Sequence, residues 1–498
     1  MAQRHLDRLT AIDASFLAQE GRASHMHVGA LAIFEGPAPD VEDFLDHIRS
    51  RLHLVPRYRQ KLAFPPIELG MPLWVDDPNF NLEYHIRHSA LPEPGSEEQL
   101  LLLTGRIFSQ RLDRSKPLWE MWLVEGLEGN RFGLISKTHH SVVDGVSGID
   151  LATVLFDLTP VPQPVPTDGD PWVPAPEPSG AELVAAGLRG IVRTGIGAVG
   201  GVVKAISHPE ATAGRVTEAL EGVGEIAWAT LNAAPETPVN VEIGPHRRFQ
   251  GVRFGLEDFK TVKNAFDCTV NDVVLSTVAG ALRRFLHHRG TRTEGLELRA
   301  LVPVSIRPTG AEAQLGNQIA AMRGPLPVYI DDPVARLRAV KQAMDGLKES
   351  KQAVGAEVIA AAQNFAPPTV MAQASRLNFS TRLFNLIVTN VPGPQFPLYI
   401  LGREMQEIFP VAFLPENHAM ALAIMSYNGG LNVGLLADFD AVPDLDVVAE
   451  GLQESLDELL DAAARAAGRS GRKRAGSSPG GRGKGARSRS RNGSRATA

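Results

Sequence analysis

A proline-rich segment near the middle of the chain limits what this sequence can fold into. Residues 159–180 read TPVPQPVPTDGDPWVPAPEPSG. Proline lacks a backbone N–H donor and fixes one backbone angle, so this density excludes a regular helix and favours extended, semi-rigid chain. The total of 498 residues is enough for several domain-sized units. We therefore interpret the segment as a crossover between two folded regions.

The composition on either side of this segment suggests four parts. They are an N-terminal half (1–158), the crossover with an Ala/Gly-rich stretch (159–238), a C-terminal half (239–467) and a tail (468–498). The Ala/Gly-rich stretch has a helical pattern broken by glycines. Its apolar face near Ile191–Ile206 fits either a packed helix pair or a lipid-facing amphipathic surface.

The tail differs from the rest of the chain in charge. Gly468–Ala498 holds ten Lys and Arg residues and no acid, so the other residues carry −16 although the whole chain carries only −6. The tail has almost no large apolar side chains, which predicts disorder. It could contact anionic lipid headgroups or have no fixed partner. Because no aromatic residues are interleaved for base stacking, we expect no specific nucleic-acid partner.

The remaining composition indicates a cytoplasmic protein. The first residues carry charges where a signal peptide needs an apolar core, and no run of about 18 apolar residues suggests a membrane span. Peripheral association with a membrane or with lipid inclusions stays open. The single cysteine, Cys268, excludes an internal disulfide framework and a multi-cysteine metal site. We expect no metal.

Local patterns predict mixed α/β structure in both halves. In the N-terminal half, Glu120–Val124 and Arg131–Lys137 are predicted strands, and a helix is expected at about Val146–Leu158. The C-terminal half is predicted to contain a helix capped at Thr269–Asp272, strands at Leu296–Ile306 and Phe384–Thr389, a hairpin of Met420–Tyr427 with Leu431–Asp438, and a final helix at Leu445–Ala466. Strands and helices do not alternate strictly, so mixed sheets are favoured over a Rossmann core.

The segment with the clearest chemical content is LISKTHHSVVDGVSG, residues 134–148. It places His139 and His140 where a predicted strand ends, and Asp144 and Gly145 follow. Histidine can take up and return a proton near neutral pH. Asp144 can fix the turn or the imidazole by hydrogen bonding, and Gly145 permits a tight turn. The alternative is a histidine pair that only satisfies backbone groups at a strand end.

Taken together, these residues resemble the bacterial bifunctional wax ester synthase/acyl-CoA:diacylglycerol acyltransferase family, within the chloramphenicol acetyltransferase-like CoA-dependent acyltransferases. His139-His140-Ser141-Val142-Val143-Asp144-Gly145 is similar to its HHxxxDG motif. Further segments that fit the family are Leu9–Leu17, Asp76-Asp77-Pro78, Pro117-Leu118-Trp119, Asn271-Asp272, Gly316-Asn317 and Asn390–Pro394. The resemblance covers about Leu9–Ala467. It implies an α/β fold of two chloramphenicol-acetyltransferase-like mixed-sheet halves with an interface active site, joined by a crossover.

The resemblance also implies a reaction. A long-chain acyl-CoA would donate its acyl group to diacylglycerol, giving triacylglycerol, with acyl-CoA as co-substrate and no cofactor. By the family's assignment His140 is the general base, with His139 in support, Asp144 organising the loop and Gly145 at the turn. The alternatives are wax ester synthesis from a fatty alcohol, acylation of another lipid alcohol, and a non-catalytic paralogue that binds neutral lipid or coats inclusions.

Two further segments have candidate roles in binding substrate. Pro117, Leu118 and Trp119 would either shape the acyl pocket or pack the core. Asn271 would either donate a hydrogen bond to the oxyanion or belong to a helix cap.

Overall fold

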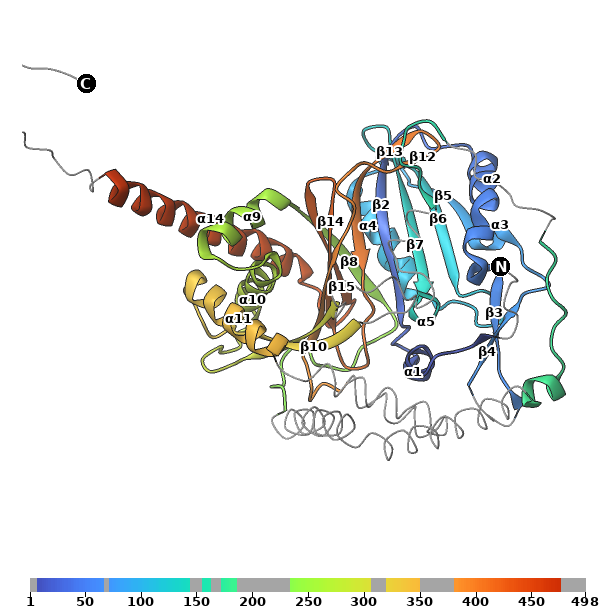
Figure 1. The fold of residues 1–498 in the computed structure, drawn as a ribbon, viewed down its shortest axis with the longest axis horizontal. Helices are drawn as coiled ribbons and strands as arrows, with labels where there is room; N and C mark the ends of the chain where they lie inside the picture. The colour runs from blue at the N-terminus through green and yellow to red at the C-terminus, as the bar shows by residue number, and fades with distance from the viewer. Residues whose placement is uncertain are drawn as a thin grey trace, which may run out of the picture.

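Two six-stranded mixed sheets form the framework of the molecule, and they lie side by side in Figure 1. The computed structural model describes residues 7–66, 71–143, 155–162, 172–185, 233–305, 319–349 and 380–475. The first sheet has the order β12 (Tyr399–Ile400), β13 (Arg403–Val411), β2 (His27–Glu35), β7 (Arg131–His139), β6 (Trp119–Leu127) and β5 (Ile86–Ala90). The second has the order β10 (Ile319–Leu326), β9 (Leu298–Ser305), β11 (Leu386–Pro392), β14 (Met420–Tyr427), β15 (Gly430–Asp438) and β8 (Arg247–Gly255). The mixed α/β prediction is confirmed.

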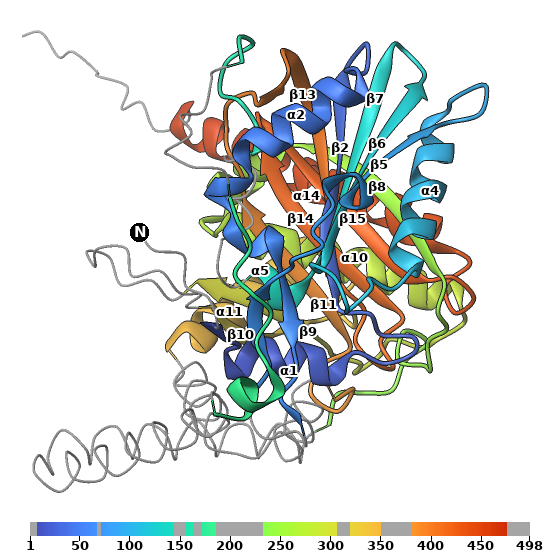
Figure 2. The same ribbon diagram turned by 90° about the vertical axis from the view of Figure 1, so that its right-hand side faces the viewer.

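Both halves of the molecule also contain helices. The N-terminal half contains α1 (Ala11–Gln19), α2 (Val41–Arg51), α3 (Leu82–His85), α4 (Glu97–Ser109) and α5 (His140–Val143), with 3-10 turns at Leu52–Leu54 and Pro56–Arg59. A small sheet of β1 (Asp7–Arg8), β4 (Leu73–Asp76) and β3 (Gln60–Ala63) lies beside them. The C-terminal half contains α9 (Leu256–Phe266), α10 (Val270–His288), α11 (Pro333–Glu349) and α14 (Leu445–Ala475). In Figure 2, α2 crosses the outer face of the first sheet.

The two sheets share one hydrophobic core. Alternation along β2 sends Leu31 and Ile33 into a cluster with residues of the second sheet, whereas Ala32 and Phe34 join a separate cluster under α2. Between the sheets, α4 packs against β8. A Cβ on Gly105 would lie 2.8 Å from the Arg247 carbonyl oxygen, so the absence of a side chain there permits this approach.

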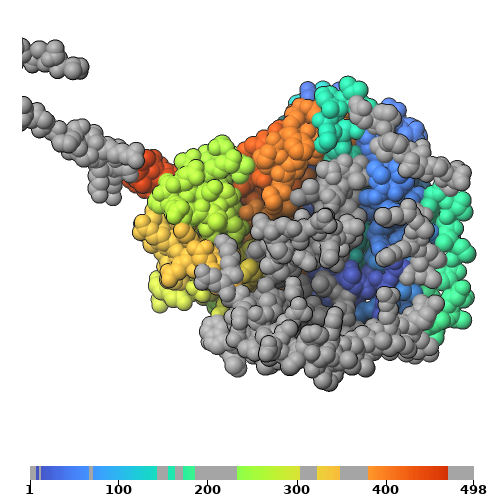
Figure 3. Space-filling model, viewed as in Figure 1, coloured from blue at the N-terminus to red at the C-terminus, as the bar shows by residue number. Residues whose placement is uncertain are grey.

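A strand from the C-terminal half completes the N-terminal sheet. β13 pairs antiparallel with β2, from Met405 opposite Phe34 to Val411 opposite Gly29. In Figure 3 the orange surface of this region adjoins the teal surface of the N-terminal half. The boundary predicted at residue 239 is therefore a boundary in sequence, while the first sheet in space draws on both halves.

Several predicted elements are present. Thr269 and Asp272 form a reciprocal capping box at the start of α10. The β14–β15 hairpin turns through Asn428 and Gly429, both with positive φ, as the Asn-Gly-Gly sequence predicts.

Two predicted boundaries differ from the structure. The helix expected to reach Leu158 has ended before Asp157, which instead forms an isolated antiparallel bridge with Tyr399. The reason is tertiary: Asp157 also makes a buried ion pair with Arg51 at 2.5 Å. At the C-terminus, α14 continues to Ala475, eight residues into the segment predicted to be disordered. The predicted helical stretch beyond residue 185 and the tail beyond residue 475 lie outside the described residues.

Among the described residues, no single helix is long and apolar enough to cross a membrane. Only α9 and α10 taken together pass that test, as a pair bent by 102°.

Candidate active site

The histidine pair lies where central strand β7 ends and helix α5 begins. His139 is the last residue of β7 and faces His27 of β2 in register, and His140 is the first residue of α5. The His139 N–H donates to the Leu118 carbonyl at 3.0 Å, and the His140 N–H donates to the Met26 carbonyl at 2.9 Å. The backbone of the pair is thus fixed to the strands on both sides.

Two aromatic rings enclose the imidazole of His140. Phe16 of α1 stacks on it, with ring centroids 3.9 Å apart and an interplanar angle of 25°. Phe413, which follows β13, meets it edge-on at 5.4 Å and 88°. Phe16 comes from the N-terminal half and Phe413 from the C-terminal half, so both halves contribute to the site.

This environment keeps His140 uncharged. Burial, and then the neighbouring His139, lower the pKa of His140 to about 4, and a hydrogen bond to its own backbone carbonyl only partly offsets them. An imidazole with this pKa is unprotonated at neutral pH and can accept a proton.

His139 is held by different partners. Its Nδ1 accepts a hydrogen bond from the Ser141 N–H at 3.1 Å and lies 2.7 Å from the Ser141 hydroxyl. Because Nδ1 is an acceptor, the ring proton of neutral His139 is on Nε2. That nitrogen faces the carboxylate of Glu20, with Nε2 and Oε2 3.6 Å apart. His139 is therefore buried in a fixed orientation beside a carboxylate.

The Pro117–Trp119 segment is buried beneath the histidine pair. Leu118 and Trp119 are each 1% exposed. The Trp119 indole N–H donates to the Tyr58 carbonyl at 2.8 Å, and its ring stacks between Tyr58 and His85. These are the contacts of core packing, and the Leu118 carbonyl also holds the backbone of His139.

Asn271 lies in the first turn of α10, in the C-terminal half. Its Oδ1 accepts a hydrogen bond from Asn390 Nδ2 of β11 at 3.4 Å. Two of the family-like segments, Asn271-Asp272 and Asn390–Pro394, are thereby brought together. Within the described part of the chain, no hydrogen bond joins Asn271 to His140, so its role as an oxyanion donor stays a prediction.

The other predicted site residues cannot be placed. Asp144 and Gly145 lie outside the described residues, as does Gly316-Asn317. No group of three or more His, Cys, Asp or Glu side chains that could hold a metal ion occurs in the described ranges.

Sequence reasoning missed three residues of the site. Phe16 lies within the family-like opening segment but was given no role, and Glu20 and Phe413 were not singled out. Nothing local distinguishes Glu20 from other acids or Phe413 from other core residues, because both reach the histidines only through the fold.

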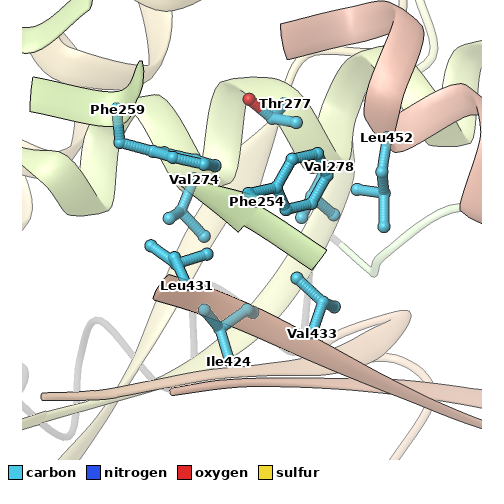
Figure 4. Close-up of a pocket in the computed structure, with 9 residues that line it drawn as sticks. All are labelled: Phe254, Phe259, Val274, Thr277, Val278, Ile424, Leu431, Val433 and Leu452. Carbon is cyan, nitrogen blue, oxygen red and sulfur yellow. The ribbon is translucent and has the colours of Figure 1, made fainter. Parts of the chain in front are cut away.

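A small apolar pocket elsewhere belongs to the core of the C-terminal half. Figure 4 shows side chains from α9, α10, α14 and the second sheet converging on it. The lining consists of Phe254, Phe259, Val274, Thr277, Val278, Ile424, Leu431, Val433 and Leu452. All nine are buried, so we assign the pocket to packing between the sheet and its helices.

Comparison with solved structures identifies the class. The fold, with a histidine pair at the end of a central strand, is that of the chloramphenicol-acetyltransferase-like CoA-dependent acyltransferases. The first condensation domain of the calcium-dependent antibiotic synthetase matches with a TM-score of 0.57 at 18% identity over 93% of this chain and 97% of that one. At that identity the likeness shows the fold alone. The wax ester synthase/diacylglycerol acyltransferase from Marinobacter aquaeolei VT8 matches with a TM-score of 0.64 at 28% identity over 92% of this chain and all of that one.

Family models and curated relatives identify the family. The wax ester synthase/diacylglycerol acyltransferase catalytic domain matches residues 9–274, and the C-terminal domain of that family matches residues 315–460. A probable diacylglycerol O-acyltransferase of Mycobacterium tuberculosis is 34% identical over 455 residues, 91% of this chain and 95% of that protein. A second from that organism is 32% identical over 471 residues, 91% and 98% respectively. The chain belongs to the wax ester synthase/diacylglycerol acyltransferase family and is an acyltransferase.

Proposed function

We propose that this enzyme transfers a long-chain acyl group from acyl-CoA to the hydroxyl of diacylglycerol, forming triacylglycerol, with His140 as the general base. The observation that carries the assignment of the base is the environment of its imidazole. The ring is held between Phe16 and Phe413, and its pKa is lowered to about 4, so it is unprotonated at neutral pH. Family membership and the diacylglycerol acyltransferase relatives support the substrates.

In the proposed reaction, one proton passes from the acceptor hydroxyl to His140 and from there to the CoA thiolate. His140 accepts the proton of the acceptor hydroxyl as the hydroxyl oxygen attacks the thioester carbonyl carbon. The tetrahedral intermediate then breaks its C–S bond, and the imidazolium gives the same proton to the departing CoA thiolate. No proton is gained or lost overall, and the proposal uses no covalent acyl-enzyme, metal or cofactor.

The low pKa of His140 sets a requirement on the rest of the site. A pKa lowered from 6.5 to about 4 makes the imidazolium costly in the free enzyme, since each pKa unit corresponds to about 1.4 kcal/mol. In the transition state, the negative charge that develops on the substrate oxygens can stabilise the imidazolium. The site must therefore keep the imidazolium close to the negative charge on the substrate oxygens.

An acyl-transfer assay with two acceptors tests this function. Purified protein receives labelled palmitoyl-CoA with either diacylglycerol or hexadecanol, and His140→Ala is assayed in parallel. We expect CoA release and labelled triacylglycerol from the wild type, and at least a roughly 100-fold loss in the variant. Turnover that persists in His140→Ala would refute the base, and absence of CoA release with both acceptors would refute acyl transfer.

Wax ester synthesis is the second candidate, because the matching family model and the Marinobacter structure carry both activities in their names. The same assay decides between them. Faster turnover with hexadecanol than with diacylglycerol would favour the wax ester synthase, and preference for another lipid alcohol would leave the chemistry unchanged.

We further propose that the enzyme works in the cytoplasm and meets its water-insoluble acceptor at a membrane or lipid inclusion, aided by the basic tail. A truncation after Ala475 removes six of the ten tail cations and keeps α14 whole. We expect weaker flotation with anionic liposomes and unchanged turnover of detergent-dispersed diacylglycerol. Unchanged flotation would argue against the tail as the contact.

A further inference from the structure

A buried carboxylate lies beside the histidine pair, and the proposed mechanism does not use it. Glu20 caps the C-terminus of α1, and its side chain is only 2% exposed. Its Oε2 is 3.6 Å from Nε2 of His139, whose side chain is 1% exposed. A buried charge needs compensating partners, so the surroundings of Glu20 indicate what it does.

Two guanidinium groups reach Glu20 from the segment after α4. Arg111 donates to Oε1 through both Nε and Nη2 at 3.1 Å. Arg114 donates to Oε2 through Nε at 2.7 Å and also contacts it through Nη2. The second nitrogen of Arg114 additionally bonds the Leu17 carbonyl at 3.0 Å, which ties this segment to α1.

Glu20 is ionised in this arrangement. Burial alone would raise its pKa, but the interaction with His139 and the positive charge of Arg114 together lower the pKa to about 2. The group of Glu20, Arg111 and Arg114 therefore carries a net charge of about +1. Without the carboxylate it would carry about +2 beside His139.

Ser141 and Glu20 face opposite ring nitrogens of His139. Ser141 donates to Nδ1, so Nε2 carries the ring proton and points toward Glu20. A catalytic triad also sets a buried carboxylate beside an imidazole, but there the two are hydrogen-bonded, whereas Glu20 lies 3.6 Å from His139, the neighbour of the proposed base, and acts on it by charge.

We propose that Glu20 is a positioning residue for acyl transfer. It faces the Nε2–H that Ser141 leaves on His139 and offsets one of the two positive charges of Arg111 and Arg114, so that His140 can become an imidazolium beside a smaller net positive charge. This inference rests on the proposed function, because it assumes that His140 takes up the proton. Glu20 acts through His139 and through charge, and not by touching substrate.

Kinetics of three variants test the proposal. Glu20→Gln keeps a side chain of the same shape, with an oxygen that can face His139 Nε2–H, but removes the charge. We expect its kcat to fall by roughly 10- to 100-fold with the KM for palmitoyl-CoA within about threefold of the wild type. Arg114→Gln alone should stay within about threefold in kcat. The double variant Glu20→Gln/Arg114→Gln restores the net charge of the group and should recover at least about tenfold over Glu20→Gln.

A control variant and the His140→Ala variant distinguish failure of this proposal from failure of the proposed function. Glu407, on β13, is another arginine-paired acid, 2.6 Å from Arg253, and Glu407→Gln should leave kcat unchanged. Wild-type kcat in Glu20→Gln, or a loss that Arg114→Gln does not relieve, would overturn the proposal. Activity that survives in His140→Ala would instead overturn the base assignment. Circular dichroism of each variant shows whether a loss is caused by unfolding.

Discussion

At the scale of single residues, two aromatic rings determine the protonation state of the proposed base, although neither ring takes part in the reaction. Phe16 and Phe413 cover part of the half-buried His140 ring, and the water that they displace would favour its charged form. A histidine exposed to solvent would be half protonated near pH 6.5. His140 remains neutral across the physiological range because of its neighbours.

The pH dependence of turnover follows from this shift. His140 must be neutral to accept a proton, so activity is lost as the pH falls through its pKa. Because that pKa is lowered to about 4, we expect kcat/KM to stay nearly constant from pH 7 to about 5 and to fall only below that. Stopped-time assays in overlapping buffers measure it, and an acid limb near pH 6.5 would contradict the prediction.

Removing the ring that stacks on His140 should shift the acid limb of the pH profile. Phe16→Leu removes the ring at 3.9 Å and admits water, so the pKa should rise toward 6.5 and the acid limb should shift upward by about one pH unit. Phe132→Leu is the matched control, since Phe132 stacks on Phe34 at the opposite end of β7. The control should lose stability without moving the limb. Equal shifts in both variants would point to a general loosening of the fold.

At the scale of elements, short sequence patterns correctly predicted caps and turns, which depend on only a few neighbouring residues. The Thr269 cap and the Asn428 turn were predicted because each is encoded within a few residues. The helix expected to reach Leu158 was wrong at its end, because Asp157 pairs with groups more than 100 positions away. In the site, the histidines were found from their motif. Glu20 and Phe413 were not, because only the fold brings them there.

The ion pair at Asp157 should contribute strongly to stability. Arg51 and Asp157 are 2.5 Å apart with side chains 6% and 5% exposed. Asp157→Ala leaves a buried guanidinium without its partner and should lower the free energy of unfolding by about 3–5 kcal/mol. Arg51→Met/Asp157→Leu removes both charges and should be less destabilised than the single variant. Urea unfolding measures both. A loss of unfolding free energy in the double variant equal to the sum of the losses in Arg51→Met and Asp157→Leu measured singly would mean that the two side chains do not interact.

At the scale of the whole molecule, sequence halves and structural halves do not coincide. The two mixed sheets were predicted from the family resemblance that the motifs carry. The transfer of β13 into the first sheet was not, because an apolar strand pattern does not specify which sheet it will join. This exchange brings Phe413 to His140 and makes the site depend on both halves.

The shared sheet predicts that the described framework unfolds as one unit. Phe409 of β13 is fully buried in the core that joins both sheets. Phe409→Ala should lower the free energy of unfolding by about 3–5 kcal/mol. Of the five tryptophans, Trp74, Trp119 and Trp122 lie in the N-terminal half, and Trp172 of the crossover contacts Phe80 and Arg59 of that half. Trp228 lies outside the described residues, so the measurements use a Trp228→Phe background. Tryptophan fluorescence then reports on the N-terminal half, whereas far-UV circular dichroism reports on both. The two signals should shift together to one lower urea midpoint, because removing a side chain from the C-terminal sequence weakens the N-terminal sheet. Two separate transitions, with the fluorescence midpoint unchanged, would show that the halves fold independently despite the exchanged strand.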